Sequence, residues 1–230
     1  MNCGGLDKCE DTRLPAILED VRAFLRQKAL LTKPYHKRPS RKAFAFQWAK
    51  GSDGRKLKVI DQKLYDRAAR EGFPANFFRE ASFDHVTFFC LPDKADFCGS
   101  ELRSCKFAVC RIDGISFGYS RIYDTEFYSS ILSHVDMYQA TLAHTRFHDC
   151  ELSHLMVQNA TLKSCHTADC TMDEVDYAGS TLGGCTFSRI TAGTVCLDWT
   201  TITQGGATEE ECRQNRKDVY RALGVKGDAA

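Results

Sequence analysis

The hydrophobic positions of this chain recur every five residues through most of its second half. From Ala95 the sequence divides without a break into 22 groups of five that end at residue 204. The central residue is Phe, Leu, Ile, Met, Val or Tyr in 20 groups, and the residue two places earlier is usually small. A period of five fits neither a helix nor a flat strand. It predicts a chain that turns a corner every five residues and points the same two side chains inwards each time.

A second period of 20 residues lies over the first. In every fourth group the residue two places before the centre is large and branched in five of six cases, whereas among the other sixteen groups only Ile190 is. The six residues are Ala95, Ile115, Val135, Leu155, Val175 and Val195. Central aromatic residues also recur, as Phe107, Phe127, Phe147 and Phe187. Layers that fill one cross-section at close-packed density predict this repeat, so we expect four groups per coil.

The groups resemble the A(D/N)LXX pattern of pentapeptide-repeat proteins, and ADFCG, ATLAH and ATLKS match it closely. The resemblance covers about 130 of the 230 residues. It implies an all-β solenoid, a right-handed quadrilateral β-helix whose successive coils stack by backbone hydrogen bonds. The same spacing occurs upstream at 71–90, and the four residues Leu91–Lys94 are predicted to form a bulge or short loop.

The two ends of the chain lie outside this repeat. Residues 1–70 predict a basic α+β subdomain with an amphipathic helix at 13–31, a hairpin turning at Gly51–Gly54, and a short helix at Gln62–Arg70. Residues 71–204 form the predicted β-helix. Residues 205–230 contain a capping box at Thr208, and so predict a helix that covers the last coil. Its apolar stripe is Cys212, Val219, Tyr220 and Leu223. This helix either plugs the tube or also pairs two copies as a homodimer.

Charge is divided between these regions. The chain carries a formal charge of +1, but residues 1–70 hold 17 Lys and Arg against 8 Asp and Glu, and residues 71–204 hold 9 against 17. On the side of the tube that begins at Ala95 there is no Lys or Arg, and Tyr119, Tyr138 and Trp199 share it. The outward acidic residues of that side are Asp96, Asp136, Asp176 and Asp198.

A secondary acidic face is predicted on the side that begins at Cys110, where Arg111 is the one basic residue. Its acidic residues are Asp113, Glu151, Asp173 and Glu174. Two interpretations remain open for both faces. Negative charge keeps a tube from associating with itself, or it imitates the regular charge of duplex DNA before a protein that normally holds DNA.

Residue types that carry chemistry are explained by packing and exposure. Six cysteines occupy the small inward position, where thiols act as apolar fillers; they are Cys105, Cys110, Cys150, Cys165, Cys170 and Cys185. Four histidines fall at the last position of a group, near corners; they are His85, His134, His144 and His154. Cys3 and Cys9 are a weak metal-binding pair. There is no Ser/His/Asp arrangement, phosphate loop or HExxH motif. We therefore expect no enzyme, no cofactor and no metal.

The chain begins with a polar, charged segment and contains no apolar run long enough to span a bilayer, so we expect a cytoplasmic protein without a membrane partner. Resemblance to bacterial pentapeptide-repeat proteins of the Qnr, MfpA and McbG kind implies a DNA mimic that binds DNA gyrase or topoisomerase IV. Such proteins protect the enzyme from quinolones or peptide toxins, a form of antibiotic resistance. The alternative is a scaffold or accessory protein whose basic N-terminal region, including the loop at 33–42, contacts nucleic acid or a protein partner.

Overall fold

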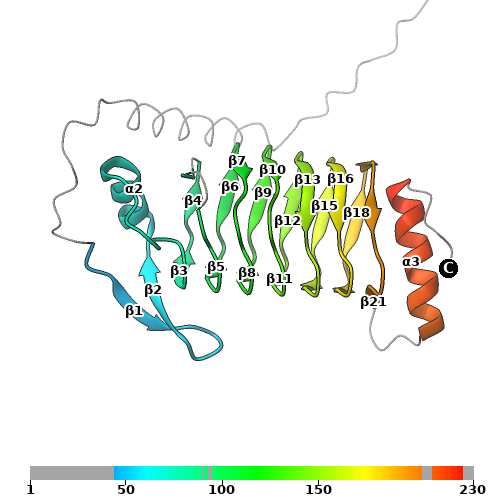
Figure 1. Cartoon of the computed structure of the whole chain (residues 1–230), viewed down its shortest axis with the longest axis horizontal. Coiled ribbons are helices and arrows are strands. Elements are labelled where there is room, and N and C mark those ends of the chain that lie inside the picture. The colour runs from blue at the N-terminus through cyan, green and yellow to red at the C-terminus, as the bar shows by residue number, and fades with distance from the viewer. Residues whose placement is uncertain (1–43, 90, 93–94, 204–208, 225–230) are drawn as a thin grey trace, which may run out of the picture.

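The structure is a computed structural model that describes residues 44–89, 91–92, 95–203 and 209–224. Stacked coils form a tube, with a hairpin and helix α2 (Gln62–Glu71) at one end and helix α3 (Glu209–Leu223) at the other (Figure 1). The predicted helix at 13–31, the basic loop at 33–42, Cys3 and Cys9 lie outside the described residues. So does part of the predicted loop at Leu91–Lys94.

Three parallel sheets form three sides of the tube. The first continues into the hairpin and has nine strands: β1 (Gln47–Lys50), β2 (Lys56–Ile60), β3 (Ala81–Asp84), β5 (Glu101–Arg103), β8 (Arg121–Tyr123), β11 (Thr141–Ala143), β14 (Thr161–Lys163), β17 (Thr181–Gly183) and β21 (Thr201–Thr203). The second has six: β4 (Thr87–Phe88), β6 (Lys106–Ala108), β9 (Glu126–Tyr128), β12 (Arg146–His148), β15 (His166–Ala168) and β18 (Thr186–Ser188). The third contains β7 (Arg111–Asp113), β10 (Ile131–Ser133), β13 (Glu151–Met156), β16 (Thr171–Asp176) and β19 (Thr191–Ala192), and β20 (Val195–Cys196) also pairs with β16.

The register of these strands advances by 20 residues per coil. Leu102 pairs with Ile122, which pairs with Leu142, and the other two sheets keep the same step. On the fourth side, isolated bridges join Asp96 to Ser116, Ser116 to Asp136, and Asp136 to Met156. The predicted four-group coil and the β-helix fold are confirmed.

The corners explain why five residues make one side. The last residue of every group from 95 to 199, except the group that ends at Thr194, has a φ in the left-handed region. Ser104, Asp124 and His144 are examples, with φ of 51°, 50° and 53°. One left-handed residue in five bends the extended chain without interrupting the backbone hydrogen bonds to the next coil. The exception at Thr194 follows Ile190 and Ala192, where the large and small residues of the repeat exchange places.

The interior is a column of stacked side chains. Phe107 and Phe127 have ring centroids 4.5 Å apart and planes 4° apart, and Phe127 and Phe147 follow at 4.9 Å and 10°. A second column stacks Phe97 on Phe117 at 4.8 Å. Parallel strands in register place equal side chains directly above one another, so large and small positions fill each layer alike. The aromatic stacking predicted from the sequence is confirmed.

The inward cysteines pack as small residues. Cys105, Cys110, Cys150, Cys165 and Cys170 are buried, and Cys185 is partly buried. The Cys150 thiol lies 3.4 Å from the carbonyl oxygen of Phe127, one coil away. Burial raises the pKa of Cys105 to about 12, so its thiol stays protonated at neutral pH. Among the described residues no cluster of three or more His, Cys, Asp or Glu could hold a metal ion.

The N-terminal end is closed by the hairpin and α2. Strands β1 and β2 pair antiparallel, and β2 then pairs parallel with β3, so the hairpin continues a side of the tube. Asp61 caps α2 by accepting a hydrogen bond from the Leu64 amide at 2.8 Å. The buried Tyr65 ring packs on Phe88 with centroids 5.0 Å apart. The predicted hairpin and short helix are therefore present, and they cover the first coil.

The C-terminal helix closes the other end. Leu223 is buried, and Val219 and Tyr220 pack against the core. Three side chains satisfy backbone groups of the last coil: the Tyr220 hydroxyl accepts from the Leu197 amide at 3.1 Å, Arg216 donates to the Thr200 carbonyl at 2.9 Å, and Asn215 donates to the Ile202 carbonyl at 2.8 Å. A sheet edge without a partner needs such a cover. The predicted plug is therefore present; the Cys212 side chain lies outside the described residues, and the homodimer stays a prediction.

Glu101 joins the hairpin to the tube, because its carboxylate accepts hydrogen bonds from the Ser52 amide and hydroxyl, each at 2.9 Å, and pairs with Arg103. Burial raises its pKa, but these hydrogen bonds outweigh burial and hold the pKa below its ordinary value. A lowered folded pKa stabilises the fold above the unfolded pKa of about 4.3, and this contribution is lost as the pH falls through the folded pKa.

We therefore expect Glu101→Gln to lower stability at neutral pH and to reduce the fall in stability on acidification. Urea unfolding from about pH 6 to about pH 3 measures both effects. An unchanged slope in that range would mean that Glu101 does not couple the hairpin to the tube. Asp124→Asn, an exposed change on the same side of the tube, is the control.

Candidate protein-binding face

The fourth side of the tube is here named the acidic face. It consists of the groups 95–99, 115–119, 135–139, 155–159, 175–179 and 195–199, which together contain no Lys, Arg or His. Three of the predicted site residues occupy the same position in alternate coils, namely Asp96, Asp136 and Asp176. Asp198 lies at a different position of its group. With coils about 4.8 Å apart, successive carboxylates of the column are about 10 Å apart.

Each aspartate of the column also closes its own turn. Asp136 accepts hydrogen bonds from the Tyr138 amide at 2.8 Å and from the Ser116 hydroxyl at 3.0 Å. Asp176 repeats the arrangement with the Ala178 amide at 2.8 Å and the Gln158 side chain. These bonds fix the carboxylates in place without neutralising them. The aspartates therefore have a structural role, in addition to presenting a charge.

Asp96 differs from the others because a cation reaches it. Arg79, in the preceding coil, pairs with its carboxylate at 2.7 Å, and the Cys98 amide donates to the second oxygen at 2.8 Å. Within the described ranges, no Lys, Arg or His forms an ion pair with Asp136, Asp176 or Asp198. The uncompensated charge of the acidic face therefore comes from these three residues.

Carboxylates on the other sides are mostly paired. Glu126 contacts Arg146 at 2.9 Å and Lys106 at 3.9 Å, and Asp169 pairs with Arg189. These pairs join successive coils, as opposite charges in neighbouring strands do. The acidic face is distinguished from these sides by what its carboxylates lack.

The secondary acidic face places imidazoles beside two of its carboxylates. His134 lies 3.1 Å from Asp113 and His154 lies 3.4 Å from Glu174, while the two rings have centroids 4.6 Å apart. The hydrogen bond from His134 lowers the pKa of Asp113. Of the other two predicted residues, Glu151 is exposed and Asp173 accepts from the Thr194 amide at 3.1 Å. This face holds more of its charge in local contacts than the acidic face does.

Exposed apolar side chains concentrate on the acidic face. Five large hydrophobic residues of the described chain are exposed, and three of them lie here: Tyr119 at 52%, Met156 at 44% and Trp199 at 88%. The Tyr119 ring meets Tyr138 edge to face, with centroids 5.8 Å apart. The sequence placed the three aromatic residues on this side but did not single out Met156, which replaces an aspartate of the column. Carboxylates with exposed aromatic residues are typical of a surface that binds another protein.

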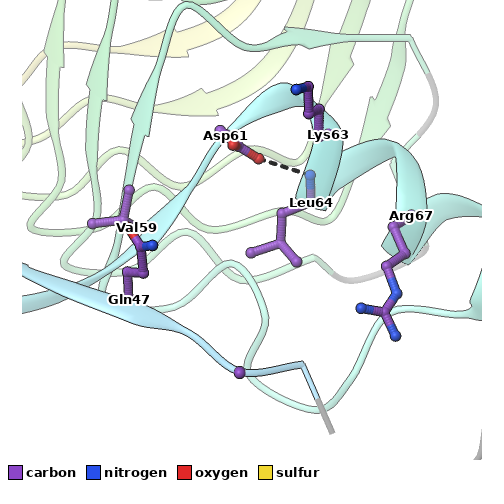
Figure 2. Close-up of a pocket in the computed structure, with 7 residues that line it drawn as sticks. Gln47, Val59, Asp61, Lys63, Leu64 and Arg67 are labelled. Atoms are coloured by element: carbon purple, nitrogen blue, oxygen red, sulfur yellow. Dashed lines mark hydrogen bonds between the residues drawn. The ribbon is translucent and has the colours of Figure 1, made fainter.

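A pocket of about 320 Å³ lies between the hairpin and α2 (Figure 2). Asp61 is engaged as the helix cap, and Arg67 stacks on Phe44 at 5.0 Å and pairs with Glu71 at 3.1 Å. Its polar groups thus stabilise α2, and none forms a nucleophile–base pair. No helix in the described part of the chain is long and apolar enough to cross a membrane.

No protein-family model and no curated protein matches the chain. Three solved structures are similar to it. HetL, a pentapeptide repeat protein involved in heterocyst differentiation regulation from the cyanobacterium Nostoc sp. strain PCC 7120, is 15% identical; the match covers 56% of this chain and 65% of HetL, with a TM-score of 0.28. Full-length QnrB1, a plasmid-mediated fluoroquinolone resistance protein, is 14% identical over 73% of this chain and 95% of its own, with a TM-score of 0.28. Rfr23, a pentapeptide repeat protein from the cyanobacterium Cyanothece 51142, is 10% identical over 54% and 84%, with a TM-score of 0.24.

The chain thus spans just under two thirds of the length of HetL. Identities at this level concern the fold alone, and the assignment rests on features of the chain itself. These are the groups of five, the register of 20 residues and the left-handed corners. By these features the chain is a pentapeptide-repeat protein with a β-helix fold.

Proposed function

We propose that the chain is a non-enzymatic interaction protein whose acidic face binds a basic, DNA-handling surface of another protein. One observation carries the proposal: Asp136, Asp176 and Asp198 have no cationic partner among the described residues, on a side without Lys, Arg or His. A partner's cations can therefore pair with them without first displacing an internal ion pair. The same charge serves solubility in the competing interpretation, and that role would not need exposed aromatic residues beside it.

The rigidity of the face supports binding. Asp136 and Asp176 are held by backbone amides two residues on and by side chains of the coil before. Groups that are already ordered lose little conformational entropy when a partner docks. The face is a sparser charge array than DNA, since its carboxylates are about 10 Å apart along the column and phosphates are about 3.4 Å apart along each strand. We therefore propose imitation of the overall charge and rod shape, without a match for each phosphate.

The resemblance to bacterial Qnr-like proteins makes DNA gyrase or topoisomerase IV the first partner to test, with protection from quinolones or peptide toxins as the consequence. QnrB1 is described as a fluoroquinolone resistance protein, and extending that role to this chain is part of the proposal. An accessory role through a basic N-terminal surface is the alternative. In the described hairpin, however, Arg55 pairs with Asp53 and Lys56 lies over Trp48. Internal contacts thus occupy these cations, which favours the acidic face.

The test compares wild-type protein with the triple variant Asp136→Asn, Asp176→Asn and Asp198→Asn. Asn keeps the side-chain oxygen that accepts the turn hydrogen bond, so the fold should be retained while three charges are removed. We expect the wild type to bind gyrase and alter its supercoiling reaction, and the triple variant to bind at least about tenfold more weakly.

The matched control carries Glu151→Gln, Asp173→Asn and Glu174→Gln, which removes three charges from the secondary acidic face. Equal loss of binding in both triple variants would indicate that total charge, not the acidic face, attracts gyrase. Wild-type protein that neither binds gyrase or topoisomerase IV nor changes supercoiling, with or without a quinolone, would refute this partner.

A further inference from the structure

We infer that the acidic face recognises arginine in preference to lysine, through the exposed aromatic side chains beside its carboxylates. The partner would present an arginine-rich segment. The inference rests on the proposal that this face binds a basic protein, and it is independent of which protein that is. It assigns the anchoring role to Tyr119 and Trp199, which the charge argument alone does not use.

The first observation is the exposure of these side chains. Trp199 is 88% exposed and Tyr119 is 52% exposed, although both come from a tube whose other aromatic side chains are mostly buried. The Met156 side chain, 44% exposed, lies on the same side in a coil between them. Trp, Tyr and Met are the residue types that are enriched in protein interfaces and at their energetic centres.

The second observation is the position of the two aromatic residues in the repeat. They stand in one column of corner residues whose other members are small or polar: Gly99, Gln139, Asn159 and Gly179. Tyr119 and Trp199 both have left-handed backbones, with φ of 57° and 55°. Gly and Asn adopt this conformation with less strain than bulky side chains do. Fold stability therefore does not favour an aromatic residue at these corners, and packing does not use it.

Each aromatic corner lies next to a carboxylate without a cationic partner. Tyr119 meets the ring of Tyr138, whose amide donates to Asp136, and Trp199 directly follows Asp198. A guanidinium group can pair with a carboxylate through two parallel hydrogen bonds and also lie flat on an aromatic ring. An ammonium group pairs as a point charge and has no planar face. This combination of groups favours arginine.

The spacing sets the length of the partner segment. Tyr119 and Trp199 are four coils apart, which is about 19 Å along the tube. An extended peptide covers that distance with about six residues. A dodeca-arginine peptide is therefore long enough to reach both corners, with Asp136, Asp176 and Asp198 on the same side.

The experiment measures binding of fluorescent dodeca-arginine and dodeca-lysine peptides to the full-length protein at physiological ionic strength. We expect arginine to bind about fivefold more tightly than lysine, since ring contacts with exposed cations are modest. Tyr119→Gly and Trp199→Gly should each reduce this ratio, and the double variant should bring it to about one. Thermal unfolding should show that the double variant is at least as stable as the wild type, because glycine relieves the left-handed strain.

Gln139→Gly is the matched control, because it makes the same backbone change in the same column. It should leave the ratio of affinities at the wild-type value. Equal binding of the two peptides by the wild type would overturn the inference, as would a double variant that keeps the arginine preference. An arginine preference without gyrase binding would refute gyrase as the partner and leave this inference standing. Gyrase binding without an arginine preference would do the reverse.

Discussion

Replacing Phe127 by Ala should lower the free energy of unfolding by about 3–5 kcal/mol, the usual loss for a buried phenylalanine. Its ring is fully buried and stacks on Phe107 below and Phe147 above. The backbone on each side is held in register by neighbouring coils, so the cavity cannot readily collapse. Urea unfolding monitored by circular dichroism measures the change. Phe127→Leu, which keeps most of the volume, should cost less.

Phe187 provides a control in the same column. It is only partly buried near the end of the tube, so Phe187→Ala should cost less than about 2 kcal/mol. The column is interrupted between Phe147 and Phe187 by Thr167. If Phe127→Ala and Phe187→Ala cost the same, the layered packing described above would be wrong.

The second large effect is expected at the C-terminal cap. Leu223→Asp should destabilise the protein by at least about 3 kcal/mol, because it removes a buried leucine and leaves a carboxylate in an apolar site. Leu223 is 2% exposed beneath the last coil. Loss of the cap would also uncover the edge of β21, whose carbonyls at Thr200 and Ile202 are bonded by α3. An open edge pairs with other chains, so we also expect association that increases with concentration.

Ala222→Asp is the control for the cap. Ala222 is exposed and next to Leu223, so the same charge there should change stability by less than about 0.5 kcal/mol. Size-exclusion chromatography with light scattering reports the association, and urea unfolding reports the stability. A Leu223→Asp protein that is as stable and as monodisperse as the Ala222→Asp protein would show that α3 does not seal the tube.

The tube could be predicted from the sequence because its rule is local and repeated. Each side uses the same five positions, so Phe107, Phe127 and Phe147 could be placed above one another by counting. The left-handed corners were not predicted, because their residues share no type: Ser104, Asp124 and His144 are alike in φ but not in chemistry. The hydrogen bond from the backbone, not the side chain, defines that position.

Contacts between the ends and the tube could not be predicted. Arg79 reaches Asp96 only because the coils bring residues 17 apart in sequence together, and it removes one charge from the predicted stripe. Asn215 and Arg216 of α3 bond carbonyls of the last coil, although neither belongs to the apolar stripe that predicted the cap. The hairpin was predicted as part of a separate subdomain, but β2 extends a side of the tube. These arrangements depend on tertiary neighbours, which a periodic pattern does not specify.

The central claim is that the acidic face is the binding surface of the molecule, and hydroxyl-radical footprinting tests it directly. The method reports the accessibility of Trp, Tyr and Met side chains, which are the exposed residues of this face. With the dodeca-arginine peptide bound, oxidation of Tyr119, Met156 and Trp199 should fall, while Trp48 on the hairpin should react as in the free protein. Unchanged oxidation of the three residues, or protection of Trp48 in their place, would contradict the account.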